Sequence, residues 1–546
     1  MRKQFFYTLI LSAFALQLAA QTALPTVQEV YKIFQNQCVS CHGSNSPAGG
    51  LDLVGNGATE LQRAQNVASK LTNINPTNAF ALSKGYKRVY PGRVDQSFLF
   101  RKINRGFESA VEALHASEGD AMPQNYPNNS LTPLEKEIIR QWILFGAKST
   151  GVSFNKSVVE TFYNVGGEQS FPDGPPPAPS PGEGFQLKMG PFYLAPDGEV
   201  EYYQKWELNL PSNVEVNGLD FKISPFSHHF LLYNFTGNGA ASIPAGLRLA
   251  ANHSQINLVA AVQEATELRL PNKTAFKWSN DMVLDFNSHY INYSLSQPFQ
   301  CEAYINVYTQ IPGTAAQEMF ATLLVNPNIP IPNSGDLITH TKTELQFGAD
   351  SIYIWGLMGH THQYGRGYKV WKRLPNGQKG ELIYDASCPM GTPGCPTPWY
   401  DYRHIPIRYW EPSLPVKWGN GIIHEAQWVN EGPVPVNFGP TSADEMMVLI
   451  AFYTNQPITV GANEPDLQDF DNQILVWPNP SPGKFNFTLP EGTESLRSFR
   501  LFDLRGREVL RRNDLLGPSF ELDLSSLAPG IYFYDADGRS GKLERG

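Results

Sequence analysis

The stretch Val283-Leu284-Asp285-Phe286-Asn287-Ser288-His289-Tyr290 is typical of the middle of this chain. It has the length and mixed polarity of a β-strand. Similar alternating runs, cut by Pro, Gly and Asn, occur at Glu201–Leu210, His229–Asn234 and Ser351–Leu357. They continue from about residue 187 to 456, which is too long for one sandwich of about 100 residues. We therefore expect two packed antiparallel β-sandwiches here.

The composition supports a mainly β, multidomain protein. The 546 residues include 46 Gly, 43 Pro and 24 Tyr, and only 17% are charged. A net charge of -9 is mild for this length and argues against a nucleic-acid partner, which would require a basic face. Five cysteines are too few for a disulfide scaffold.

The N-terminus has the features of a secretory signal peptide. Arg2 and Lys3 precede an apolar run from Phe5 to Ala20 that ends in small residues. The alternative is a membrane anchor, but the run is short for a bilayer and no later segment is apolar enough to span one. We expect residues 1–20 to be removed and the protein to act outside the cytoplasm.

Composition divides the rest of the chain into five parts. Apolar spacing predicts a helix over Thr26–Gln37, and Thr132-Pro133-Leu134-Glu135 is a capping box that opens another helix. A proline-rich stretch follows and predicts a semi-rigid spacer. The expected parts are a small helical domain at 21–160, a linker at 161–186, sandwiches at 187–322 and 323–458, and a small β unit at 470–546.

Cys38-Val39-Ser40-Cys41-His42 is the attachment pattern of a c-type haem. Two thiols at this spacing add to the haem vinyl groups, and the following histidine reaches the iron. The alternatives are a redox dithiol or half of a zinc site, but no further cysteine occurs before Cys301. We expect covalent haem c at Cys38 and Cys41, with His42 as an iron ligand.

The second iron ligand is expected to be Met122. It lies in Ala121-Met122-Pro123-Gln124, ahead of the capped helix, and this arrangement resembles small bacterial cytochrome c domains. Thioether ligation would raise the reduction potential. His115 is the alternative ligand.

Five histidines of the β region form a pattern suited to metal binding. His360 and His362 are spaced so that both imidazoles leave one face of a strand. The adjacent pair His228-His229 would point to opposite faces unless a bend or bulge intervenes. His289 is the fifth. Imidazoles suit Zn, Cu, Fe or Ni, and an added thioether favours Cu(I).

The order of these motifs, ending in Asp444-Glu445-Met446, resembles the copper type II, ascorbate-dependent monooxygenases of the peptidylglycine and dopamine type. The resemblance covers about residues 200–456 and implies two copper ions on two β-sandwiches. It assigns an electron-transfer copper to His228, His229 and His289. It assigns an oxygen-binding, catalytic copper to His360, His362 and Met446, with Met447 as the local rival of Met446.

The sequence departs from that family around the substrate. Where the family has an arginine, a tyrosine and an asparagine, this chain has Met358, Ile450 and Val448. No charge remains to pair with a carboxylate, so we expect an apolar or neutral substrate.

The disulfides also differ from the family. A family disulfide is missing, since Gln427 and Met447 occupy its approximate places. Cys388 and Cys395 could form a local disulfide, with Cys301 free or paired to one of them.

The C-terminal segment resembles the sorting domain of the type IX secretion system of Bacteroidetes. The resemblance lies in Val476-Trp477-Pro478-Asn479-Pro480, in the turn Asp503-Leu504-Arg505-Gly506-Arg507, and in the terminal position. The alternative is an ordinary immunoglobulin-like module. The resemblance implies an exported, surface or secreted protein that engages the type IX machinery.

Together these features lead to the expectation of a secreted oxidoreductase, a copper monooxygenase that hydroxylates a C–H bond. Its partners would be dioxygen, the substrate and a reductant (ascorbate-like or a redox protein), with electrons relayed through the haem. The alternatives are a non-enzymatic haem and copper protein of the cell surface, or an adhesive sandwich with incidental histidines.

Overall fold

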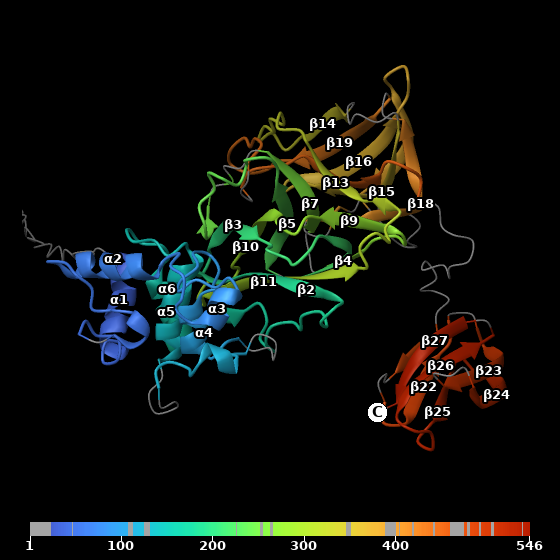
Figure 1. Ribbon diagram of the computed structural model, residues 1–546. Helices are drawn as coiled ribbons and strands as arrows, with labels where there is room; N and C mark the ends of the chain where they lie inside the picture. The colour runs from blue at the N-terminus through green and yellow to red at the C-terminus, as the bar shows by residue number, and fades with distance from the viewer. Residues whose placement is uncertain are drawn as a thin grey trace, which may run out of the picture. The chain divides into compact units, whose positions relative to one another are not determined.

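The computed structural model of the chain contains two compact units, Met1–Thr459 and Val460–Gly546 (Figure 1). It describes residues 23–45, 47–107, 113–124, 131–224, 226–249, 251, 255–262, 266–344, 351–387, 400–402, 405–417, 420–439, 443–458, 474–477, 481–490, 493–503, 507–537 and 539–545. Most regular structure in these ranges is β, as expected for a mainly β multidomain protein. No helix in them is both long and apolar enough to cross a membrane.

The N-terminal part of the first unit is helical. The helix expected before Cys38 is present with the expected bounds, and the capping box of Thr132 and Glu135 forms as predicted. Here the Glu135 N–H donates to Thr132 Oγ1, and the Thr132 N–H donates to Glu135 Oε2. The helices are α1 Thr26–Gln37, α2 Glu60–Leu71, α3 Ala79–Ser83, α4 Phe98–Asn104, α5 Pro133–Leu144 and α6 Lys156–Val165.

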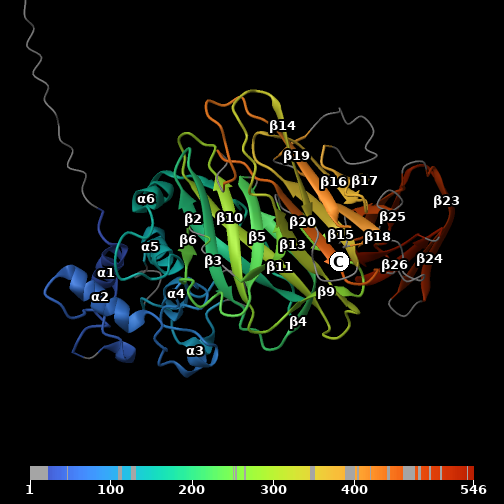
Figure 2. The same cartoon turned by 90° about the horizontal axis from the view of Figure 1, so that it is seen from above.

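Two facing sheets follow and form the first sandwich (Figures 1 and 2). Phe221 of one sheet packs on Phe230 of the other, with ring centroids 6.0 Å apart. One sheet contains β1 Glu168–Gln169, β2 Gly184–Leu194, β4 Val214–Ile223, β8 Thr266–Arg269, β9 Thr274–Trp278, β11 Phe299–Gln310 and β12 Gln317–Glu318. The other runs in the order β6 Leu247–Arg248, β3 Glu199–Glu207, β10 Val283–Ile291, β5 Ser227–Phe235 and β7 Ile256–Val262. The pairing is antiparallel except for the short pairs β1–β11 and β9–β12, which are parallel.

The second sandwich begins at β13. One sheet has the order β13 Phe320–Val325, β20 Val448–Thr454, β15 Ser351–His360 and β18 Arg408–Lys417. The other has the order β14 Leu337–Glu344, β19 Ile422–Val429, β16 Gly365–Arg373 and β17 Lys379–Asp385. The ring of Tyr368 on β16 covers Gly359 on β15, because a Cβ on that glycine would lie 2.5 Å from the ring. Gly359 therefore faces the interior of this sandwich, and its neighbours Met358 and His360 face the other way.

The helical part is packed directly against the first sandwich. The Arg93 guanidinium lies 3.6 Å from the centroid of the Trp206 ring and donates to the Glu207 carbonyl. Gln204 on β3 donates to the carbonyl of Gly92. The backbone approaches closely here, since a Cβ on Gly246 would lie 2.4 Å from the amide nitrogen of Gly146.

The proline-rich stretch, expected as a semi-rigid spacer over 161–186, makes specific contacts with its neighbours. Its first residues complete α6, and β1 pairs with β11. The carbonyls of Pro176 and Pro177 accept hydrogen bonds from Gln186 and Asn306, which lie on neighbouring strands. Proline cannot donate to a ladder, but its carbonyl still accepts, so this segment is bound along the sheet without being a strand.

The C-terminal unit is a small β-sandwich with its own apolar core. Its sheets have the orders β21 Leu475–Trp477, β22 Lys484–Thr488, β25 Ser519–Asp523, and β24 Glu508–Leu516, β23 Ser495–Asp503, β26 Gly530–Ala536, β27 Arg539–Arg545. Phe487, Phe499 and Tyr534 pack together in the core.

Candidate metal centre and haem-attachment site

The first sandwich contributes three histidines from β5 and β10. His229 lies opposite His289, whereas the next partner of β10, Tyr290, lies opposite Ser227. His228 is therefore the extra residue of a β-bulge. The bulge removes the obstacle that adjacent histidines on a regular strand would face, and all three rings approach one another, with centroids 5.2 to 5.5 Å apart.

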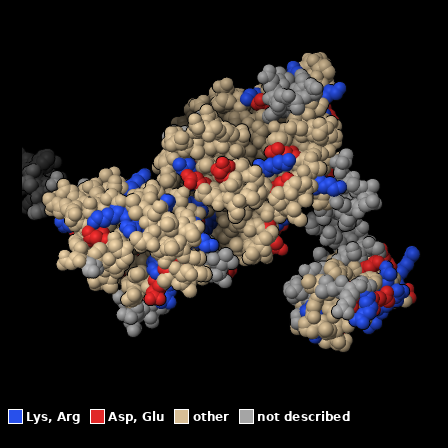
Figure 3. Space-filling view, viewed as in Figure 1, with Lys and Arg blue, Asp and Glu red and all other residues tan. Residues whose placement is uncertain are grey.

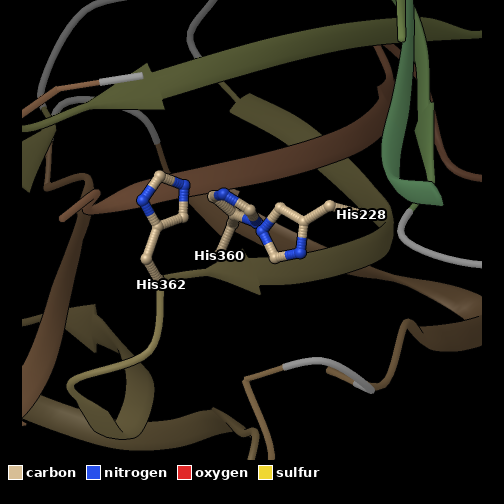
Figure 4. Close-up of side chains that lie close together, drawn as sticks. All are labelled: His228, His360 and His362. Carbon is tan, nitrogen blue, oxygen red and sulfur yellow. The ribbon is translucent and has the colours of Figure 1, made fainter. Parts of the chain in front are cut away.

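The second sandwich contributes His360 and His362 from the end of β15. His360 is the last residue of the strand, and His362 follows two residues later, just outside it. Their ring centroids are 5.2 Å apart and their planes are nearly perpendicular. Both rings approach His228 of the first sandwich, at 5.7 and 5.5 Å (Figure 4).

All five predicted histidines thus meet in one buried cluster between the sandwiches. Each side chain is at most 9% exposed. The potential ligand atoms of His228, His360 and His362 all lie within 4.8 Å of one another. His229 is also close to the second sandwich, with its ring 5.8 Å from His360.

The ring nitrogens of this cluster fit a metal. Four of them are buried and have no hydrogen-bond partner among the described residues: His228 Nε2, His229 Nδ1, His289 Nδ1 and His362 Nε2. Each unpaired buried polar atom costs about 1–3 kcal/mol. Coordination to metal ions would satisfy all four nitrogens, so the donor set fits a metal.

Hydrogen bonds on the opposite ring nitrogens orient two of these imidazoles. His289 Nε2 lies 2.6 Å from Glu199 Oε1, and His362 Nδ1 lies 3.1 Å from the Asp444 carbonyl oxygen. When these nitrogens donate, the lone pairs of His289 Nδ1 and His362 Nε2 are left free. Ligating histidines are usually fixed in this way by carboxylates or carbonyls.

The electrostatic environment keeps four of the imidazoles neutral. Burial, and then the neighbouring histidines, lower the pKa of His228 to about 3. Burial likewise lowers the pKa of His362 to about 4 and holds the pKa values of His229 and His360 well below the ordinary value. Neutral imidazole is the form that binds metals.

Met446 is tied to this cluster through Glu445. The buried Glu445 carboxylate accepts the backbone N–H groups of His362, Tyr364 and Met446 and the indole N–H of Trp428. Burial raises the pKa of Glu445 to about 7 against these hydrogen bonds. The rival Met447 is fully buried, and its sulfur accepts from Asn326 Nδ2 at 3.4 Å.

Apolar side chains surround the His360 side of the cluster. Met358 lies opposite Ile450, and His360 lies opposite Val448, in the pairing of β15 with β20. Directly opposite residues share a face of the sheet, so these four side chains lie on the face that carries His360. Met358, Val448 and Ile450 are at most 6% exposed.

The candidate haem site lies at the end of α1. His42 Nδ1 is 3.1 Å from the Leu51 carbonyl oxygen, which leaves Nε2 free to ligate iron. Cys38 and Cys41 are both unpaired, and Cys41 is exposed. The residues therefore fit a covalently attached haem with an oriented histidine ligand.

Met122 and His115 have different environments. Met122 is half-buried against the apolar core, and its N–H donates to the Lys102 carbonyl at the end of α4. His115 is exposed and stacks on Phe80 at 4.4 Å, and its Nδ1 accepts the Ser117 N–H. Because His115 Nδ1 accepts this N–H, the ring proton lies on Nε2, and in this arrangement His115 offers iron no free lone pair.

Of the remaining cysteines, Cys301 is buried and forms no disulfide in the structure. Cys388 and Cys395 lie outside the described residues.

Sequence reasoning missed the carboxylates around the cluster. Glu199 and Glu201 stand on β3, next to β10, and Glu201 Oε1 is 3.8 Å from His229 Nε2. It also missed Tyr402, whose ring lies 6.4 Å from that of His228. Glu445 was visible only as part of the Asp-Glu-Met motif. The strand register that brings these groups to the histidines cannot be predicted from any local sequence pattern.

Comparison with known proteins identifies the C-terminal unit. The family described as secretion system C-terminal sorting domain matches residues 475–545. No curated protein matches the chain.

Solved structures resemble the chain only remotely. The CBM51-2 and INT domains of Clostridium perfringens ZmpB show 9% identity and a TM-score of 0.11, over 44% of this chain and 85% of that one. A biofilm-associated protein BSP domain shows 8% identity and a TM-score of 0.12, over 63% and 81%.

The sorting domain defines the class of protein: an exported cargo protein that interacts with a secretion machinery. The machinery is the type IX secretion system, and the protein is secreted or displayed at the surface of a Bacteroidetes-like bacterium. This confirms the expected localisation. Figure 3 shows basic and acidic side chains interspersed on the face in view.

Proposed function

We propose that the protein is a secreted copper- and oxygen-dependent monooxygenase that receives electrons through a covalent haem c. The observation that carries the proposal is the convergence of five buried imidazoles, four with unpaired buried ring nitrogens, from two sandwiches. Copper held there would supply redox chemistry with dioxygen. In the overall reaction one oxygen atom enters a substrate C–H bond and the other leaves as water, using two electrons from an external reductant.

The residues have distinct roles in this proposal. Glu199 orients His289, and the Asp444 carbonyl orients His362, so the lone pairs of both rings are directed before metal arrives. Met446 would add a labile thioether beside His360 and His362, positioned through its backbone bond to Glu445. A weak sulfur ligand favours Cu(I).

The apolar side chains on the sheet face that carries His360 determine the polarity of the proposed substrate. Met358, Val448 and Ile450 exclude water beside His360 and offer no charge. A substrate carboxylate placed there would lose its hydration without gaining a cationic partner, which is costly. The proposed substrate is therefore neutral and largely apolar where it meets the site.

The helical part would carry the electron donor at a fixed position. Cys38 and Cys41 would attach the haem, with His42 and Met122 as iron ligands. Because Arg93, Gly92 and Gly146 are packed directly on the first sandwich, the donor is held by an interface and not by a flexible tether.

The proposal is tested with the full mature chain, loaded with haem and copper. Oxygen uptake and product formation are screened by mass spectrometry over neutral C–H substrates with a chemical reductant. We expect His360→Ala and Met446→Leu to abolish product, and Met447→Leu to retain it because its sulfur is engaged by Asn326. Copper binding without oxygen-dependent product from any substrate would favour the non-enzymatic alternative.

Electron delivery has a separate test. The haem is pre-reduced, and its absorbance is followed after mixing with oxygen and substrate. We expect re-oxidation at least as fast as turnover in the copper-loaded protein and slow re-oxidation in the His229→Ala/His289→Ala variant. Haem that stays reduced while product accumulates would remove the haem from the reaction.

A further inference from the structure

We infer that His228 joins His360 and His362 in a three-imidazole metal site that bridges the two sandwiches, which leaves His229 and His289 as a neighbouring pair. This inference rests on the metal-binding part of the proposed function. It differs from the grouping implied by the sequence resemblance, in which His228 belongs with His229 and His289.

The geometry supports this grouping. Among the described residues, His228, His360 and His362 are the one set of three metal-ligating side chains whose donor atoms all lie within 4.8 Å of each other. The three come from two different sandwiches, and Figure 4 shows them side by side. A single ion placed among these donor atoms would be shared by all three rings, and it would satisfy the unpaired His228 Nε2 and His362 Nε2.

Because His228 is the extra residue of a β-bulge, its ring is not held in register with His229 and His289 and can point toward the second sandwich. His229 and His289 are directly paired across β5 and β10. Glu199 and Glu201 lie behind these two rings, at 2.6 Å from His289 Nε2 and 3.8 Å from His229 Nε2. Among the described residues, His228 forms no ion pair with a carboxylate at these distances. Its ring is the one that approaches both His360 and His362.

The arrangement makes the metal a link between the sandwiches. β7 of the first sandwich and β13 of the second lie against each other, and the Gln317 amide donates to the Pro457 carbonyl. An ion held by His228 and by the end of β15 would add a coordinate connection across the same boundary. Metal binding is then expected to stabilise the docking of the two sandwiches.

The test removes the neighbouring pair first. In the full mature chain carrying His229→Ala and His289→Ala, Co(II) and Cu(I) are titrated, with the Co(II) d–d spectrum and a competing chelator as readouts. We expect one ion per chain and a spectrum of a nitrogen-rich site. Adding His228→Ala should raise Kd at least tenfold and alter the spectrum, whereas adding Asp336→Asn, an exposed change on the second sandwich, should change neither.

The second half of the experiment starts from a variant that lacks the other two proposed ligands. In His360→Ala/His362→Ala, removal of His228 should change the residual affinity for metal less than threefold. Two outcomes overturn the inference: an unchanged Kd on adding His228→Ala to the first background, or a tenfold loss on adding it to the second. His228→Gln, with thermal unfolding recorded, repeats the measurement if His228→Ala does not fold. A wild-type chain that binds no metal would instead overturn the proposed function, which separates the two failures.

Discussion

Glu445 accepts the backbone N–H of His362 at 2.8 Å and thereby joins the end of β15 to the segment that carries Met446. The same carboxylate receives three further N–H donors and is fully buried. Two segments more than 80 residues apart in sequence are held together by one side chain. The relative positions of the histidine pair and the methionine therefore depend on it.

Glu445→Gln should disrupt this connection. An amide has one acceptor oxygen, and its NH₂ would face N–H donors, so we expect a loss of about 2–4 kcal/mol in the free energy of unfolding. Weaker Cu(I) binding should accompany it. Denaturant unfolding and Cu(I) competition measure both. Glu381→Gln, an exposed change on β17 of the same sandwich, is the matched control, and equal effects of the two would refute the role of Glu445.

Glu199→Gln tests the orientation of His289. The carboxylate lies 2.6 Å from His289 Nε2, and loss of such a partner typically lowers metal affinity about 10–100-fold. The fold should persist, because Glu199 is partly exposed at the start of β3. Glu267→Gln, on the exposed strand β8, should leave the affinity unchanged. Metal titration of both variants is the measurement, and a normal affinity in Glu199→Gln would contradict the assignment.

Gly246→Ala should loosen the helical part from the first sandwich. This residue has φ +87°, and its Cβ would lie 2.4 Å from Gly146 N and 2.7 Å from Leu144 O. Gly85→Ala is the control, because it has φ +76° and open space around it. We expect Gly85→Ala to cost about 1–2 kcal/mol from backbone conformation alone. Gly246→Ala should lower the free energy of unfolding by clearly more than this. It should also speed limited proteolysis between the helical part and the first sandwich.

Acid should destabilise the helical part through Glu118. Burial raises the pKa of this carboxyl, but hydrogen bonds from Arg101 and from the His115 N–H outweigh burial and hold the pKa below its ordinary value. The stabilisation is therefore present above about pH 4.3, the unfolded pKa, and is lost as pH falls through the folded pKa. Thermal unfolding from pH 6 to 2 should show a shallower acid limb for Glu118→Gln than for wild type. Asp336→Asn, in an exposed turn, should reproduce the wild-type profile.

Met122→Ala should remove a weak far-red charge-transfer band from the oxidised haem and lower the reduction potential. His115→Ala should retain the band, because the His115 ring stacks on Phe80 and is not expected to bind the iron. Absorption spectra and redox titration of the haem-loaded chain distinguish the two. A spectrum unaffected by Met122→Ala would exclude the methionine as a ligand.

Local patterns predicted the local structure well. The helix before Cys38, the capping box of Thr132 and the need for a bulge at His228 all follow from short-range spacing, and each is present. The contacts of the proline-rich stretch could not be predicted. Its composition describes its backbone, but not the side-chain amides of Gln186 and Asn306 that donate to Pro176 and Pro177.

The five predicted histidines lie together in the structure, but which ring approaches which could not be predicted from the sequence. Which ring meets which depends on the register of β5 with β10 and on how one sandwich docks on the other. The same is true of Glu199 and Glu201, whose relation to the histidines arises only across neighbouring strands. Long-range pairing is set by the whole fold, and no single segment encodes it.

The two apolar cores have a consequence for the life of the exported protein. The core of the first unit extends from Val27 to Ile458, through the helices and both sandwiches, whereas that of the C-terminal unit starts at Ile474. A protease that cut the chain between these points would remove the delivery label and leave the buried apolar packing of the cargo complete. The first unit, from α1 to β20, therefore retains its own apolar core after the sorting domain is removed.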